Sequence, residues 1–441
     1  MKKVCAISFC WLLLCVAAAF VFPQDAEPSE LPESPGLSNA ESGETGLPPI
    51  VRGLIASGET LLSNTLVMTY NIIYSNVTGE GGWATPSSDS LYENFTVPWI
   101  WEKTDGFKVN QFGHPFQGST YFSAGRVNGF GFYESAFFSA LGSSTWESLF
   151  ESNRASINDC ITTLTGSMPM GEMLYRLYLA ACAAGVPAPV AGIINPTAAI
   201  HRLITGLKPP VPDSSLSLLR FHLGTGFAQT HYSLTGSSLS NSASNSREMF
   251  AFRGFYADVG FAAIHGDPFD QSGVIPFEHF ELAMSLGLDI GNYMNIRFIS
   301  DGYLFSFTPV KTATDTMSTG LSLHMDFISM GKFDIYDGTI DQSSLALDWT
   351  IKYQHLFTPN TIFQTKFHAG GTFMGASNYY SPDREEELKN YGGGLNGKLF
   401  LALENRKLGK FEASLMGYAL WTFPGTSAIS QGVVYWLFAS C

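Results

Sequence analysis

The chain has 441 residues and a formal net charge of −14, with 14% charged residues, 14% aromatic residues and 44 glycines. The acidic balance argues against nucleic-acid binding, because neutralising phosphates requires a basic surface. Few charges, many aromatic side chains and abundant glycine are together typical of a membrane β-barrel, whose outer band and aromatic girdles need apolar residues without long helical spans.

Residues 1–19 have the organisation of a secretory signal peptide. The basic pair Lys2-Lys3 precedes an apolar run that contains Ala17-Ala18-Ala19, and we expect cleavage after Ala19. Removal of this segment takes the formal charge from −14 to −16. Residues 20–49 are acidic and proline-rich, so they are predicted to form a disordered tether. These features predict export, and with a barrel they predict the outer membrane of a Gram-negative-type envelope.

Three cysteines remain after the signal peptide: Cys160, Cys182 and Cys441. An odd number does not indicate a disulfide framework. A single Cys160–Cys182 bridge is one alternative in an oxidising compartment. Free thiols that pack as small apolar side chains are the other.

Residues 50–210 are predicted to form a helical region. Helices are expected at 53–74, 116–151, 170–178 and from Asn195-Pro196 to 203, with a loop at 79–90 and an extended segment at 95–101 that Pro98 demotes to an edge or loop. The uncharged run 177–194 has the length of a membrane span. Its glycines and prolines predict two short buried helices instead.

Small residues recur every fourth position within the predicted helix 116–151. They are Gly125, Gly129, Ser135, Ser139 and Ser143. Small residues on one side of a helix allow a second backbone to approach closely. The pattern therefore predicts tight helix packing in preference to a catalytic role.

Residues 211–441 show a period of two, with apolar and polar side chains alternating over many segments, which predicts an antiparallel β-barrel. Ten segments begin near residues 214, 249, 277, 294, 317, 345, 362, 391, 410 and 431. Short links are expected at 291–292, 358–360 and 408–409. In an up-and-down barrel, the short links at one rim are separated by an even number of strands. The predicted links at 291–292 and 358–360 are separated by three strands. We therefore predict ten to twelve strands, with a miscount near residues 331–341.

Ionisable and amide side chains are embedded among aromatic and small residues between positions 110 and 176. In chain order these are Asn110, His114, Arg126, Asn128, Glu147, Ser156, Asn158, Asp159, Glu172 and Arg176. Because buried charge is costly unless it is paired, this stretch is either a satisfied polar network or a working site.

The same stretch resembles a bacterial family of envelope proteins defined by domain of unknown function 3943. The shared elements are an Asn before His-Pro-aromatic-x-Gly, then Arg-x-Asn-Gly, Trp-Glu, Ser-x-Asn-Asp, and Gly-Glu with a nearby Arg, and all occur in order between Trp99 and Arg176. The family has no established activity. The resemblance therefore implies an exported, outer-membrane architecture, and it does not indicate which reaction or function the protein has.

Two interpretations of the constellation remain. His114, Glu147, Ser156, Asp159 and Glu172 are the catalytic candidates for a nucleophile–base–acid site, which His201-Arg202 could extend. Alternatively, Arg176 bridges Glu172 or Glu147 while Ser156 or Asp159 caps a helix, and this network is favoured. The nine residues Asn110, His114, Arg126, Asn128, Glu147, Asn158, Asp159, Glu172 and Arg176 are the predicted binding set. No catalytic residue is assigned.

The sequence predicts an α+β protein: an N-terminal helical region followed by a barrel whose lumen is too wide to be filled by its own side chains. The helical region is therefore predicted to be a plug. A plugged channel or uptake protein for a small solute is the first functional hypothesis. An enclosed hydrolase acting on envelope lipid or cell-wall material, and a structural or assembly barrel, are the alternatives. The predicted partners are outer-membrane lipid, the barrel assembly machinery and a small solute, with no nucleic acid, no cofactor and no metal. The strand histidines are assigned no role.

Overall fold

The structure is a computed structural model that describes residues 47–79, 82–101, 106–207, 216–236, 246–270, 273–289, 293–332, 340–381, 386–424 and 429–440. The predicted signal peptide, almost all of the predicted tether and Cys441 lie outside these residues. The chain divides into two compact units, Met1–Ser214 and Ser215–Cys441. Each unit is described by itself.

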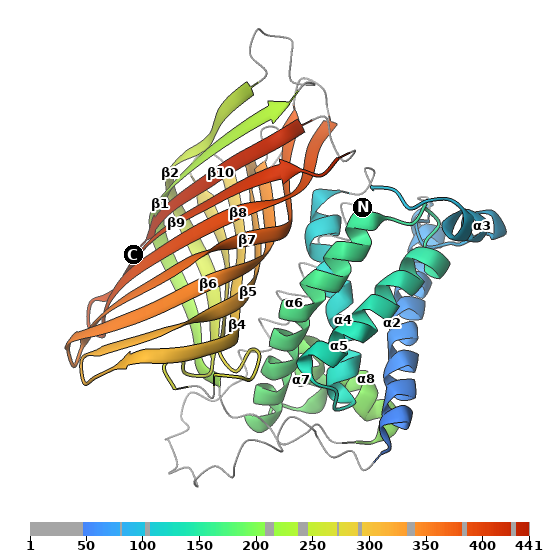
Figure 1. The fold of residues 1–441 in the computed structure, drawn as a ribbon, viewed down its shortest axis with the longest axis horizontal. Coiled ribbons are helices and arrows are strands. Elements are labelled where there is room, and N and C mark those ends of the chain that lie inside the picture. The colour runs from blue at the N-terminus through green and yellow to red at the C-terminus, as the bar shows by residue number, and fades with distance from the viewer. Residues whose placement is uncertain are drawn as a thin grey trace. The chain divides into compact units, whose positions relative to one another are not determined.

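The first unit is a bundle of helices (Figure 1). Its elements are α2 (Pro49–Thr78), α3 (Ser88–Thr96), η3 (Val109–Gly113), α4 (His114–Val127), α5 (Phe132–Thr145), η4 (Trp146–Phe150), α6 (Ile157–Ala183), α7 (Ala188–Ile194) and α8 (Pro196–Thr205), where η marks a π-helical turn. Helix α4 is central and packs against α2, α5, α6 and α8. None of the described helices combines the length and the apolar character needed to cross a membrane.

Local capping explains where two of these helices begin. The Ser156 side chain accepts a hydrogen bond from the Asp159 amide at the start of α6, and the Asn195 side chain accepts from the Ala198 amide at the start of α8. Ser and Asn at this position satisfy amides that have no partner within the helix. Pro196 occupies the first turn of α8, where a missing N–H has no consequence. The predicted start of this helix is confirmed.

Four predicted segments of the helical region differ from the structure. The predicted loop 79–90 and extended segment 95–101 overlap α3, whose start is fixed by a capping box between Ser87 and Ser90. The predicted helix 116–151 is broken between α4 and α5, where Gly129 adopts a φ of +79°. The predicted helix 170–178 is the second half of α6, which continues through Pro169. In each case tertiary packing or a capping side chain overrides the local pattern.

Small residues permit the close approach of α4 to its neighbours. A Cβ at Gly118 would lie 2.3 Å from the Thr163 carbonyl oxygen of α6, and one at Gly125 would lie 2.6 Å from Ser135 Oγ of α5. The predicted tight packing is therefore present. However, Gly125 lies on α4, Gly129 lies in the turn after it, and Ser135, Ser139 and Ser143 lie on α5, so the small residues do not line one side of a single helix.

The second unit is a closed antiparallel barrel in which the order of the described strands is β1-β10-β9-β8-β7-β6-β5-β4-β3-β2 (Figure 1). The strands are β1 (Leu216–Gly236), β2 (Ser246–His265), β3 (Phe280–Asp289), β4 (Tyr293–Lys311), β5 (Asp315–Lys332), β6 (Ile340–Thr358), β7 (Thr361–Ser381), β8 (Glu386–Asn405), β9 (Gly409–Thr422) and β10 (Ile429–Ser440). Each pairs with its neighbours in sequence, and β1 pairs with β10.

The predicted miscount near residues 331–341 does not occur in the described strands. Strands β5 and β6 pair directly, with Met330 opposite Ile340. The odd number of strands between the predicted short links has another explanation. A short link at residues 312–314, between β4 and β5, was not predicted, and it shares one rim with the links at 359–360 and 406–408. The predicted link at 291–292 lies outside the described residues. Because β3 and β4 are consecutive antiparallel strands, they are joined at the rim opposite to the one that joins β4 to β5.

Side chains alternate between an apolar outer face and a polar lumen. On β6, Leu347 and Trp349 are 41% and 44% exposed, whereas Asp348 and Thr350, which alternate with them, are fully buried. Because the barrel is closed, every strand contributes alternate residues to one lumen. The predicted period of two is therefore observed, with the polar face turned inward.

Candidate functional site

Glu172 on α6 lies at the centre of the helical unit between two arginines. Arg126 Nε lies 2.8 Å from Glu172 Oε2, and Arg176 Nε lies 2.8 Å from Glu172 Oε1. Arg126 also donates to the Phe130 carbonyl oxygen at 2.7 Å, and its guanidinium lies over the Tyr175 ring. Glu172 is fully buried, so this ion cluster is desolvated and depends on its mutual pairing.

A second buried carboxylate, Glu59 on α2, joins three elements of the helical unit. Asn128 Nδ2 donates to Glu59 Oε2 at 2.7 Å, and His201 Nδ1 lies 2.7 Å from Glu59 Oε1. Arg52 Nη1 donates to the carbonyl oxygens of Asn128 and Gly129 at 3.1 and 3.0 Å. Asn128 and His201 were singled out from the sequence. Glu59, which connects them, was not.

The start of α6 gathers most of the remaining predicted residues. Glu147 Oε2 accepts from the Ser156 amide at 2.7 Å, and Ser156 Oγ donates to Asn158 Oδ1 at 3.1 Å. Asn158 Nδ2 donates to Asp159 Oδ1 at 2.7 Å, and His114 Nε2 lies 3.7 Å from the same oxygen. All five side chains are buried.

This geometry is that of a helix cap and a structural network. Within the described residues, no hydrogen bond joins Ser156 Oγ to His114, and the hydroxyl instead holds the first turn of α6. The pairing of Arg176 with Glu172 is present. Asn110 is buried in the turn η3, whereas Arg202 is exposed. The predicted binding set thus divides into separate polar contacts that tie helices together.

Cys160 and Cys182 are free thiols, so the alternative of a bridge between them is wrong. Burial raises the pKa of both thiols. Burial also raises the pKa of Tyr121, whose hydroxyl accepts from Gln117 Nε2 at 2.6 Å and contacts Asn64. Raised pKa values keep these groups neutral, which suits packing more than nucleophilic chemistry.

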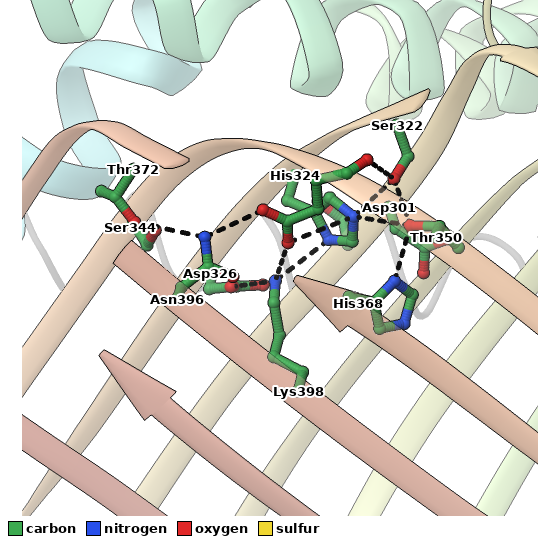
Figure 2. Close-up of polar contacts among 12 residues, drawn as sticks. Asp301, Ser322, His324, Asp326, Ser344, Thr350, His368, Thr372, Asn396 and Lys398 are labelled. Atoms are coloured by element: carbon green, nitrogen blue, oxygen red, sulfur yellow. Dashed lines mark hydrogen bonds and ion pairs between the residues drawn. The ribbon is translucent and has the colours of Figure 1, made fainter. Parts of the chain in front are cut away.

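The barrel lumen contains a denser cluster around Lys398 on β8 (Figure 2). Its Nζ lies 2.5 Å from Asp326 Oδ2 on β5, 3.0 Å from His324 Nδ1 and 3.7 Å from Asp348 Oδ2 on β6. Tyr418 on β9 donates to the same Asp326 oxygen at 2.9 Å. We call Lys398, His324, Asp326 and Asp348 the Lys398 cluster.

A second cluster has the same composition. Lys352 Nζ on β6 lies 2.6 Å from Asp301 Oδ2 on β4, 2.8 Å from Glu281 Oε1 on β3 and 2.8 Å from His279 Nε2. Lys366 on β7 adds a contact of 2.6 Å to Glu281 Oε2. We call Lys352, His279, Glu281 and Asp301 the Lys352 cluster.

The two clusters repeat one arrangement around the barrel. A His-x-carboxylate pair lies at the start of β3 or on β5, a second carboxylate lies on the next strand, and the lysine lies three strands further on. An ammonium group only donates hydrogen bonds, so the histidine nitrogen beside it must be an unprotonated acceptor. His279 fits this tautomer, because its Nδ1 lies 3.1 Å from the Gly266 carbonyl oxygen and can donate to it.

These contacts reach across part of the lumen between strands that do not pair. Strands three places apart are separated by roughly 14 Å along the wall, yet Lys398 and Asp326 meet and are 0% and 1% exposed as side chains. Arg220 on β1 likewise reaches Glu404 on β8 at 3.1 Å. The expectation that the lumen is too wide to be filled by its own side chains stays a prediction. Lysine and arginine side chains are long enough to reach acidic groups on strands three places away.

His279, Glu281 and Asp301 form a donor set that could hold a divalent cation. Lys352 Nζ already lies within 2.8 Å of a donor atom of each. A metal ion would need the ammonium group to withdraw. The lysine therefore serves as the internal cation of this cluster.

The sequence prediction missed both clusters because each strand histidine was considered alone. The usable signal was the i, i+2 spacing in His279-Phe280-Glu281 and in His324-Met325-Asp326. On a strand, that spacing places both side chains on one face. The lysines on the polar face of later strands, Lys352 and Lys398, supply the positive charges that pair with these carboxylates.

The family model of domain of unknown function DUF3943 matches residues 98–187, which confirms the resemblance. Among solved structures, the chain is similar to the attachment invasion locus protein Ail of Yersinia pestis, with 10% identity, a TM-score of 0.20, and coverage of 50% of this chain and 95% of that one. It is also similar to the toluene transporter TodX of Pseudomonas putida, with 8% identity, a TM-score of 0.15, and coverage of 54% and 92%. A porin mutant of Rh. blastica matches at 8% identity with a TM-score of 0.12, covering 50% and 100%. No curated protein matches in sequence.

Proposed function

We propose that the protein is an outer-membrane β-barrel that conducts or takes up a small polar solute, and that the Lys352 and Lys398 clusters close its lumen. The observation that carries the proposal is the contact of 2.5 Å between Lys398 Nζ on β8 and Asp326 Oδ2 on β5. It joins two strands that lie three places apart in the barrel through two charged groups, and those groups can separate if water enters.

The apolar outer face supports insertion in a bilayer. Leu223, Phe255 and Leu395 are 86%, 75% and 60% exposed on strands whose alternate residues face a polar lumen. Alternation of this kind matches lipid outside and polar groups inside. The proposed partners follow from it: outer-membrane lipid around the barrel, the assembly machinery that inserts it, and a small solute in the lumen.

The charged lumen favours a gated path over a purely structural barrel. Apolar side chains of similar volume usually stabilise an interior as well as a buried ion pair does, or better. A barrel that only needs to be filled has no use for two lysine clusters. Charged groups are useful where the interior must become hydrated, because water can take over the hydrogen bonds of separated partners.

In this proposal the gate consists of barrel side chains that project into the lumen, and a plug is not required for closure. The helical unit could still occlude the path as a plug. Removal of residues 53–206 addresses that possibility separately from substitutions in the lumen.

The test is single-channel conductance of the refolded mature protein in a planar bilayer. The variant Lys398→Ala/Asp326→Ala removes one crossing, and we expect more frequent openings and a larger conductance than in the unaltered protein. The control Lys410→Ala/Glu412→Ala removes a pair on β9 whose side chains are 33% and 39% exposed, and it should behave like the unaltered protein.

The outcomes separate the hypotheses. A folded lumen variant that conducts no more than the control contradicts the proposed gate. If only the form lacking residues 53–206 opens, the helical unit is the plug and the clusters are structural.

A further inference from the structure

Helix α2 has an inverted distribution of polarity. The residues that it buries are Ala56, Glu59, Thr60, Asn64 and Asn71, four of which are polar. The large side chains that it exposes are apolar: Ile50, Leu54, Leu61, Leu66, Tyr70, Ile72, Ile73 and Val77. Helices of water-soluble bundles normally turn the apolar stripe inward.

Buried polar side chains on the inward face of α2 make specific contacts with the rest of the bundle. Asn64 Nδ2 donates to the Gly142 carbonyl oxygen at 3.1 Å, and Asn71 Oδ1 accepts from the Ala84 amide at 2.8 Å. Glu59 holds Asn128 as described above. These contacts fix which side of the helix faces the bundle, so its apolar side must face outward.

Two threonine hydroxyl groups on the outward side are satisfied by the helix itself. Thr65 Oγ1 donates to the Leu61 carbonyl oxygen at 2.9 Å, and Thr69 Oγ1 donates to the Thr65 carbonyl oxygen at 2.7 Å. Threonine is accommodated in apolar surroundings in this way, because no hydroxyl is left without a partner. No charged residue occurs from Thr60 to Thr78.

We infer that the outward face of α2 docks onto the hydrocarbon boundary of a phospholipid bilayer, with the helix lying in the plane of the interface. A helix of 30 residues is about 45 Å long, and its apolar side suits shallow burial below the headgroups. A protein partner would need hydrogen bonds and a polar rim, and this face offers few groups for either. This inference rests on the proposed location of the barrel in the outer membrane, which tethers the helical unit of the same chain to a bilayer.

The experiment uses the full mature chain in phosphatidylcholine vesicles, in a background with Cys160, Cys182 and Cys441 replaced by Ala. An environment-sensitive nitrobenzoxadiazole label is attached at Thr69→Cys on the outward face of α2. The control label is at Asn153→Cys, an exposed position between η4 and α6. Flotation of the vesicles first establishes that the barrel is inserted.

We expect lipids with brominated acyl chains to quench the label at position 69 and leave the label at position 153 unaffected, with iodide in the water giving the reverse. The variant Leu66→Asp/Ile73→Asp should reduce the lipid quenching at position 69 by about threefold or more, because two apolar anchors are lost. Iodide quenching at position 69 overturns the inference. So does protection from both quenchers, which would mean that protein, such as a second copy, covers the face. Neither outcome depends on whether the lumen conducts.

Discussion

Replacing Lys398 by Met should destabilise the barrel by about 3–5 kcal/mol, the usual cost of leaving a buried charge without its partner. The side chain is fully buried and contacts Asp326 at 2.5 Å, His324 at 3.0 Å and Asp348 at 3.7 Å. After the substitution, Asp326 keeps the Tyr418 hydroxyl at 2.9 Å as its donor. A single neutral donor does not compensate a buried carboxylate.

The measurement is equilibrium unfolding of the refolded protein in urea, followed by tryptophan fluorescence and by heat-modifiable mobility on gels. Lys410→Met is the matched control. Its ion pair with Glu412 is about one-third exposed, so the loss should be about 1 kcal/mol or less. The double variant Lys398→Met/Asp326→Leu replaces the pair with apolar groups and should recover most of the lost stability. A cost for Lys398→Met as small as that of the control would refute the assignment of a desolvated, paired lysine.

Three further predictions concern the helical unit. Glu172→Gln leaves two guanidinium groups without their carboxylate and should cost about 3–5 kcal/mol in thermal or urea unfolding followed by circular dichroism, whereas Gln at the exposed capping residue Glu134 should cost about 1 kcal/mol or less. Gly118→Ala places a Cβ 2.3 Å from the Thr163 carbonyl oxygen. It should lower the free energy of unfolding by about 1–3 kcal/mol in the same assay. An unchanged unfolding midpoint would show that α4 and α6 are not in close contact there. Because burial raises the pKa of Cys182, its alkylation by iodoacetamide should be slower than that of free cysteine at pH 8 and should keep rising at higher pH. A rate equal to that of free cysteine would contradict its burial.

Alternation along the strands was predictable because a barrel wall imposes one side chain outward and the next inward, independent of distant contacts. All ten predicted segments correspond to described strands. The strand ends were less predictable. The link at residues 312–314 carries Thr, Ala and Thr, without the glycine or proline that usually marks a turn.

Helix boundaries depended on interactions that the local pattern does not contain. Pro169 ordinarily ends a helix, yet α6 passes through it. The neighbouring stretch is held against α4, where a Cβ at Gly166 would lie 2.7 Å from the Pro115 side chain. Such packing between residues about fifty positions apart cannot be seen in a window of a dozen residues.

Partners across the fold were the least predictable part of the sites. Arg176 and Glu172 are four residues apart on one helix, so their pairing followed from spacing. Glu59 and His201 are 142 positions apart, and nothing local connects them. In the lumen the lysine and its carboxylates come from strands that do not pair, so only closure of the barrel brings them together.

Both units bury charged groups in paired contacts, Glu172 with two arginines in the helical unit and Lys398 with Asp326 in the barrel. The consequence for function differs between them. In the helical unit, Glu172 and Glu59 join helices, so substitutions there should impair folding before they impair any activity. In the lumen, the Lys398 cluster joins walls that are already held by the backbone ladder, and an ion pair can be removed in a matched way while the ladder remains. A functional screen of this chain is therefore most informative when it begins with paired substitutions in the lumen, where loss of closure and loss of fold can be measured separately.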